Sequence, residues 1–129
     1  MRARCRALGA QACRMVEMAQ GEIWWADLPV PRGSGAGCRR PVVVVQGNAL
    51  NRSRLATVVC VPLTSNVTWE AAPENTLVPA KVAGLPKDSV ANASQVFAVD
   101  RAYLSQRKGR LAPKRLEQIL ASIDVVIGR

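Results

Sequence analysis

Residues 39–46 read RRPVVVVQ, and residues 57–66 read TVVCVPLTSN. β-Branched side chains pack well on a pleated surface, so the two apolar runs, 42–46 and 57–63, are each predicted to form a buried strand. Arginines precede the first run, and hydroxyl and amide residues follow the second. A guanidinium at one strand end and a hydroxyl at another can together bind a phosphate group, with no acid, metal or histidine.

The rest of the first hundred residues carries shorter strand and turn signals. Residues 23–28 are predicted to form a first strand, and residues 100–104 one helical turn capped by Asp100. Loops or turns are expected at four places: a glycine-rich loop at 29–37, a polar turn at 48–54, a long polar loop at 64–75 and a turn at 85–88. A short strand is expected at 76–78, and extended pieces at 89–91 and 95–99 are expected to form one bent strand.

The C-terminal segment is the one clear helix of the sequence. Pro113 suits a first helical position and Gly128 a helix exit. Apolar residues recur at helical spacing on one face, at Leu116, Ile119, Leu120, Ile123 and Ile127. About five short strands and one terminal helix predict a mainly β fold with a C-terminal α-helix, arranged as a small, partly open barrel.

Five segments stand in order along the chain: GEIWWADL at 21–28, RPVVVVQ at 40–46, VPLTSN at 61–66, LPKDSV at 85–90 and SQV at 94–96. Together they resemble the MazF/PemK family of ribosome-independent endoribonuclease toxins. The resemblance runs from about Met18 to the C-terminus. It implies an SH3-like small barrel, a fold that gyrase-poison toxins share, and it agrees with the strand and helix pattern.

The charge of the chain points to a polyanionic partner, either nucleic acid or an acidic protein. Its 129 residues carry a net charge of +9, with a pI near 10.5. Residues 1–17 are arginine-rich and are expected to be a disordered extension, leaving a single domain at 18–129 that remains basic. No apolar stretch of 18 or more residues occurs, so no membrane-spanning segment is predicted.

The side chains available restrict the chemistry. The chain has no histidine, and its four cysteines show no C-x-x-C spacing, so no metal site and no cofactor are predicted, and the cysteines are interpreted as free thiols in a reducing cytoplasm. RNA cleavage is compatible with this inventory because RNA carries its own nucleophile, the 2′-hydroxyl. A protein then has to align the reacting atoms and stabilise charge on the phosphoryl oxygens.

By the resemblance, Arg40 matches the catalytic arginine of the family and Thr64 its catalytic threonine. Arg40 would clamp the scissile phosphate, and Thr64 would donate a hydrogen bond to it, supported by Ser65. The alternatives are a surface salt bridge for Arg40 and a side-chain-to-backbone bond for Thr64. Arg39 is expected to bind a second phosphate. The loop between the first two strands has no carboxylate at Gly35 or Ala36, where some members have one.

Further RNA-binding residues are expected at Asn66, Asn92 and Gln95. A hydrogen-bonded strand edge is the alternative for Asn92 and Gln95. Trp69 either stacks on a base or packs beneath its own loop. Trp24 and Trp25 should face opposite sides of their strand, one in the core and the other available to a dimer interface.

Taken together, the sequence predicts a sequence-preferring, metal-independent endoribonuclease toxin that cleaves single-stranded RNA, with messenger RNA as the expected target. The products would be a 2′,3′-cyclic phosphate and a 5′-hydroxyl end. By resemblance the protein is a cytoplasmic homodimer neutralised by an acidic antitoxin. The alternatives are a non-catalytic gyrase poison on the same barrel and a basic RNA-binding module that does not cleave.

Overall fold

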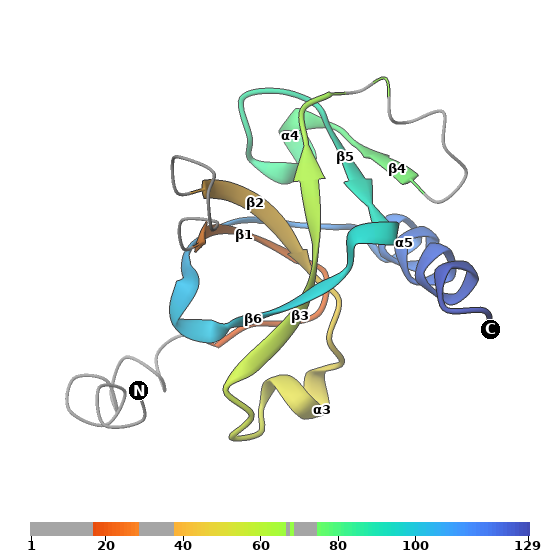
Figure 1. The fold of residues 1–129 in the computed structure, drawn as a ribbon. Coiled ribbons are helices and arrows are strands. Elements are labelled where there is room, and N and C mark those ends of the chain that lie inside the picture. Colours follow the sequence, from red (N-terminus) through yellow and green to blue (C-terminus); the bar gives the residue numbers. More distant parts are fainter. Residues whose placement is uncertain (1–16, 29–37, 67, 69–74) are drawn as a thin grey trace, which may run out of the picture.

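The computed structural model describes residues 17–28, 38–66, 68 and 75–129 (Figure 1). Nearly all of the predicted N-terminal extension, the predicted loop at 29–37 and Trp69 lie outside the described residues. No helix in the described ranges is both long and apolar enough to cross a membrane.

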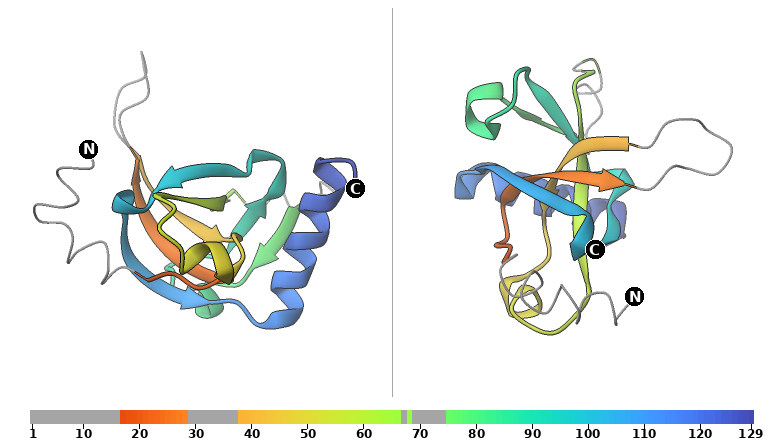
Figure 2. Two further views of the ribbon diagram at one scale, coloured as in Figure 1. Left: turned by 90° about the horizontal axis from the view of Figure 1, so that it is seen from below. Right: turned by 90° about the vertical axis from the view of Figure 1, so that its left-hand side faces the viewer.

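The described residues form seven antiparallel strands and a C-terminal helix, which confirms the predicted fold class. The strands are β1 (Glu22–Leu28), β2 (Cys38–Val44), β3 (Thr57–Thr64), β4 (Asn75–Val78), β5 (Ser89–Asn92), β6 (Phe97–Asp100) and β7 (Leu104–Arg110). Their order is β4-β5-β3-β2-β1-β7, and β6 also pairs with β3. The sheet curves around an interior, and α5 (Pro113–Val126) lies along one side of it (Figure 2).

Strand β2 begins earlier than the apolar run predicts. It spans Cys38–Val44 because pairing with β1 continues through Ala26↔Arg40 and Leu28↔Cys38. Arg40 therefore lies inside a strand, not at its start. The strand also ends two residues before Gln46, because the amides of Val45 and Gln46 both donate to the carbonyl oxygen of Val59.

Several elements were not predicted. The polar segment 48–54 contains one turn of helix, α3 (Asn48–Asn51), and α4 (Ala80–Ala83) precedes the 85–88 bend. Gln95 lies in a 3₁₀ turn, η2 (Ala93–Gln95), which separates β5 from β6 on the same edge of β3. β7, with the sequence LSQRKGR, was missed because most of its side chains are polar and at least partly exposed. The short strand at 76–78 is confirmed by β4. The extended pieces at 89–91 and 95–99 are found as β5 and β6, which are two strands separated by η2 and not one bent strand.

Both predicted helix boundaries are confirmed. Asp100 caps a 3₁₀ turn, η3 (Arg101–Tyr103), and its carboxylate accepts from the amide of Ala102 at 2.9 Å. Pro113 opens α5, and Ile119 on that helix is fully buried. The prediction for Ile127 is wrong, since its side chain is 58 % exposed beyond the end of α5.

Alternating side chains of the central strands fill two apolar clusters, one on each face of the sheet. One cluster lies between the sheet and α5, and the other in the interior of the curved sheet. In β1, Ile23 belongs to the first cluster and Trp24 to the second, so Trp24 is the tryptophan predicted for the core. Its neighbour Trp25 is half-buried on the opposite face.

A cationic groove where two strands separate

Strand β3 loses one of its two neighbours near its end, and this loss creates the candidate site. Val42↔Pro62 is the last β2–β3 pair toward the start of β2, whereas Leu63 and Thr64 pair only with β5, which lies on the opposite edge of β3. The two strands consequently diverge, as Figure 1 shows, with β3 running on toward β4 and β5. Arg40 and Thr64 each stand two residues beyond this last pair, on the two sides of the opening.

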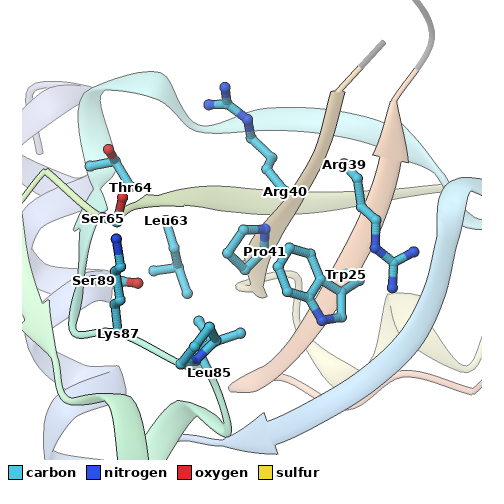
Figure 3. Close-up of a pocket in the computed structure, with 11 residues that line it drawn as sticks. Trp25, Arg39, Arg40, Pro41, Leu63, Thr64, Ser65, Leu85, Lys87 and Ser89 are labelled. Carbon is cyan, nitrogen blue, oxygen red and sulfur yellow. The ribbon is translucent and has the colours of Figure 1, made fainter. Parts of the chain in front are cut away.

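The opening is a groove of about 360 Å³ (Figure 3). It brings together four of the predicted site residues, from β2 and from the end of β3: Arg39, Arg40, Thr64 and Ser65. The remaining wall comes from β1, from the middle of β2 and β3, and from the bend before β5: Trp25, Pro41, Leu63, Leu85, Pro86, Lys87 and Ser89. Its ionisable lining residues, Arg39, Arg40 and Lys87, are all basic, so the groove attracts anions.

Arg39 and Arg40 are adjacent in β2, but their guanidinium groups extend in different directions (Figure 3). Arg39 is held on the β1 side, where it pairs with Asp27 at 3.1 Å and lies 5.0 Å from the centre of the Trp25 ring. Both members of this ion pair are half-exposed, and such pairs contribute little to stability. A phosphate can therefore replace Asp27 as the partner of Arg39 at small cost.

Thr64 makes the backbone contact expected of a threonine at a strand end and keeps its own donor. Its Oγ1 accepts a hydrogen bond from the amide of Asn66 at 3.2 Å, which is the side-chain-to-backbone bond expected at a strand end. A threonine hydroxyl also carries one donor, and accepting this bond does not use it. The bond therefore orients Thr64 and leaves its O–H able to donate to a phosphoryl oxygen.

Three other predicted RNA-binding residues lie away from the lining of the groove. The side-chain oxygen of Asn66 accepts from the amide and hydroxyl of Thr68 and so shapes the turn after β3. Asn92 is 93 % buried, with 7 % of its surface exposed, and accepts from the hydroxyl of Ser94, which matches the structural alternative. Gln95 is exposed on η2.

Lys87 is the charged groove residue that sequence reasoning did not assign. It stands in the bend between α4 and β5, within the LPKDSV segment that contributed to the family resemblance. The next residue, Asp88, ties this bend to α4 by accepting from the amide of Ala80 at 2.8 Å. The resemblance marked the segment, but only the fold brings it opposite β2.

The described residues contain no group of three or more His, Cys, Asp or Glu side chains that could hold a metal ion. Cys60 is a free thiol buried in the interior cluster, and burial raises its pKa to about 12. It therefore stays protonated, and its place in the core separates it from the chemistry of the groove.

Comparison with known proteins connects this fold and groove to one family. A family model described as "PemK-like, MazF-like toxin of type II toxin-antitoxin system" matches residues 19–127. Endoribonuclease MazF6 of Mycobacterium tuberculosis strain H37Rv is 38 % identical over 102 residues, which cover 79 % of this chain and 90 % of that protein. Endoribonuclease MazF of Staphylococcus saprophyticus is 28 % identical over 111 residues, covering 86 % and 92 %.

Solved structures show the same fold. A MazE–MazF structure from Deinococcus radiodurans superimposes with a TM-score of 0.73 at 19 % identity, covering 87 % of this chain and 96 % of the other. A mycobacterial endoribonuclease in complex with its cognate antitoxin superimposes with a TM-score of 0.68 at 22 % identity, covering 86 % and 95 %.

Proposed function

Because this chain belongs to the PemK-like, MazF-like toxins of type II toxin–antitoxin systems, we propose that it is an endoribonuclease that cleaves single-stranded RNA with sequence preference and is neutralised by an antitoxin. Both relatives described above, from Mycobacterium tuberculosis and Staphylococcus saprophyticus, are named endoribonucleases. The observation that carries the proposal is the groove itself, where Arg40 and Thr64 face the space between β2 and β3.

The reaction requires little from the protein beyond placement and charge. The 2′-oxygen of the substrate attacks the adjacent phosphorus, and the bond to the 5′-oxygen breaks, leaving a 2′,3′-cyclic phosphate and a 5′-hydroxyl. Arg40 presents planar N–H donors that match two phosphoryl oxygens, and Thr64 adds a neutral donor from the facing strand. Donors that are already in position stabilise the charge that builds up on these oxygens in the transition state.

Metal independence is part of the proposal. In metal-dependent nucleases a divalent cation neutralises the phosphoryl oxygens. Here the basic side chains that line the groove, Arg39, Arg40 and Lys87, are placed to supply that charge. The chain also contains no histidine, the usual neutral-pH acid–base residue and a common metal ligand.

The partners follow from the same surface. A basic groove suits an acidic antitoxin segment as well as RNA, so the antitoxin is expected to compete with the substrate. We further propose that the protein acts as a homodimer in the cytoplasm and that messenger RNA is its target.

The test is incubation of the purified protein with RNA in excess EDTA, followed by chemical analysis of the new ends. Cleavage that yields 2′,3′-cyclic phosphate and 5′-hydroxyl ends is the expected result, and Arg40→Ala is the control for a contaminating nuclease. A strict Mg²⁺ requirement with 5′-phosphate products would contradict the mechanism. Binding without cleavage would favour the RNA-binding module, and inhibition of gyrase without RNA cleavage would favour the gyrase poison.

A further inference from the structure

We propose that Lys87 is the general acid of the reaction, the group that protonates the 5′-oxygen as it leaves. This inference rests on the proposed ribonuclease function and adds a residue to it. Arg40 and Thr64 are placed to bind the phosphoryl oxygens, and the departing 5′-oxygen additionally needs a proton.

The groove offers few proton donors. Its described lining has two guanidinium groups, one ammonium group and two serine and one threonine hydroxyls as polar side chains. Guanidinium groups stay protonated above about pH 12, and aliphatic hydroxyls are weaker acids still. As a class, ammonium groups are stronger acids than guanidinium groups or aliphatic hydroxyls, and Lys87 carries the ammonium group of the described lining.

Lys87 is also free to perform this role. Its side chain is exposed, and within the described ranges no hydrogen bond or ion pair engages its ammonium group. Oδ1 of the adjacent Asp88 accepts from the amide of Ala80. In Figure 3 the Lys87 side chain extends from the bend before β5 toward the Thr64 and Ser65 side of the groove.

The position of Lys87 suits an in-line displacement. The attacking and leaving oxygens lie on opposite sides of phosphorus. A group that protonates the leaving oxygen therefore has to lie on the side opposite the attacking 2′-oxygen. Arg40 comes from β2 and Thr64 from β3, whereas Lys87 comes from the bend between α4 and β5. Three separate chain segments therefore present their side chains to one groove.

The proposed step balances as follows. The 2′-hydroxyl loses its proton to solvent as the 2′-oxygen–phosphorus bond forms. The phosphorus–5′-oxygen bond breaks, and its electron pair takes a proton from Nζ of Lys87, giving the 5′-hydroxyl product. The neutral amine of Lys87 then regains a proton from solvent, so that no co-reactant is needed.

The test compares leaving groups. Wild-type protein first maps a cleavage site in an oligoribonucleotide, and two versions are then made, one normal and one with sulfur in place of the 5′-oxygen at that site. A thiolate leaves without protonation, so it does not need a general acid. Single-turnover rates at saturating protein are measured for wild type, Lys87→Ala, Lys87→Arg, Arg40→Ala and the control Lys81→Ala, which changes an exposed lysine on α4 outside the groove.

Lys87→Ala and Lys87→Arg should each slow cleavage of the normal substrate by about 10²–10⁴-fold, and both should cleave the sulfur substrate at nearly the wild-type rate. Arg40→Ala should be slow on both substrates, and Lys81→Ala normal on both. Two results would overturn the proposal: equal losses of cleavage rate on both substrates for Lys87→Ala, or normal activity in Lys87→Arg. Either would mean that Lys87 contributes only its positive charge to RNA binding.

Undiminished cleavage of the normal substrate by Lys87→Ala would also overturn the role proposed for Lys87, but it would leave the proposed ribonuclease function intact. If the wild-type protein cleaved no RNA, the proposed function itself would fail. Thermal melting of each variant shows that a loss of rate is not a loss of fold.

Discussion

A Cβ atom on Gly109 would lie 2.8 Å from the carbonyl oxygen of Ala83, so the last turn of α4 rests directly on the backbone of β7. The same close approach is seen from the other segment. A Cβ on Gly84, at the end of α4, would collide with the carbonyl oxygen of Lys108 in β7. Gly84 also has a φ of +71°, which suits glycine and ends α4. This contact sets where the bend with Lys87 begins.

Gly109→Ala should therefore destabilise the protein, by roughly 1–3 kcal/mol, since two backbone segments must move apart to admit one methyl group. Chemical denaturation measures the change in the free energy of unfolding. Gly47→Ala is the matched control, because a Cβ there meets nothing within 4 Å, and its effect should stay under about 1 kcal/mol. Equal stability of Gly109→Ala and wild type would show that α4 does not rest on β7 in this way.

The proposed catalytic pair, Arg40 and Thr64, gives a second prediction. Arg40→Ala should lower the cleavage rate by about 10²–10³-fold, the usual cost of losing one transition-state donor, and should weaken RNA binding much less. Thr64→Ala should show a smaller loss of the same kind, and Thr64→Ser, which keeps the hydroxyl, should recover most of it. Single-turnover kinetics separate rate from binding. Full activity in a folded Arg40→Ala protein would remove Arg40 from the mechanism.

A third prediction concerns Glu22, which is 95 % buried, with 5 % of its surface exposed. Its Oε1 accepts from the Trp24 indole and from the amide of Ala19, each at 3.0 Å, and its Oε2 pairs with Arg107 at 3.1 Å. Glu22→Gln turns one acceptor into a donor in a crowded site, so unfolding free energy should fall by about 1–3 kcal/mol.

The control for Glu22 is Asp27→Asn, which breaks a half-exposed ion pair and should cost under about 1 kcal/mol. Denaturation curves of the two variants, collected side by side, provide the comparison. If the two variants lost equal unfolding free energy, burial would not make the contacts of Glu22 any stronger than those of the half-exposed ion pair.

Cys60 makes a prediction about pH. Burial raises the pKa of its thiol from 9.0 to about 12 in the folded protein, so folding favours the neutral form. The resulting contribution to stability is complete below pH 9 and is lost as the pH rises toward 12, because the unfolded thiol ionises first. In a variant with serine at Cys5, Cys13 and Cys38, native alkylation at pH 8 should be on the order of 10³-fold slower than in urea. Similar rates in both states would contradict burial of this thiol.

The last prediction is competition between RNA and antitoxin. The groove presents Arg39, Arg40 and Lys87 to any anion, so an acidic antitoxin segment and RNA should exclude one another, with salt-sensitive association. The measurement uses the Arg40→Ala protein, a non-cleavable RNA and increasing antitoxin. If saturating antitoxin left the RNA affinity unchanged, inhibition would have to act through a separate surface.

Much of the fold was predictable because local patterns report which faces are buried. The valine-rich runs predicted β2 and β3, and the helical spacing around Ile119 predicted α5. β7 was not predictable in this way, since a strand with polar, partly exposed side chains shows no apolar alternation. The sequence left Asn92 with two interpretations, an RNA contact and a hydrogen-bonded strand edge. The structure buries it, and such burial of a polar residue depends on segments distant in the chain.

Residue types and their spacing were enough to predict the strand-forming runs, the terminal helix and the basic charge. The roles proposed for Arg40 and Thr64 came instead from the resemblance to the family. The tertiary structure alone sets where β2 stops pairing with β3 while β5 continues on the other edge, and therefore where the groove opens. It likewise brought Lys87 to that groove, through the contact of α4 with β7. Strand pairing and close backbone contacts join segments that are far apart in the chain, and a local residue pattern does not specify which segments will pair.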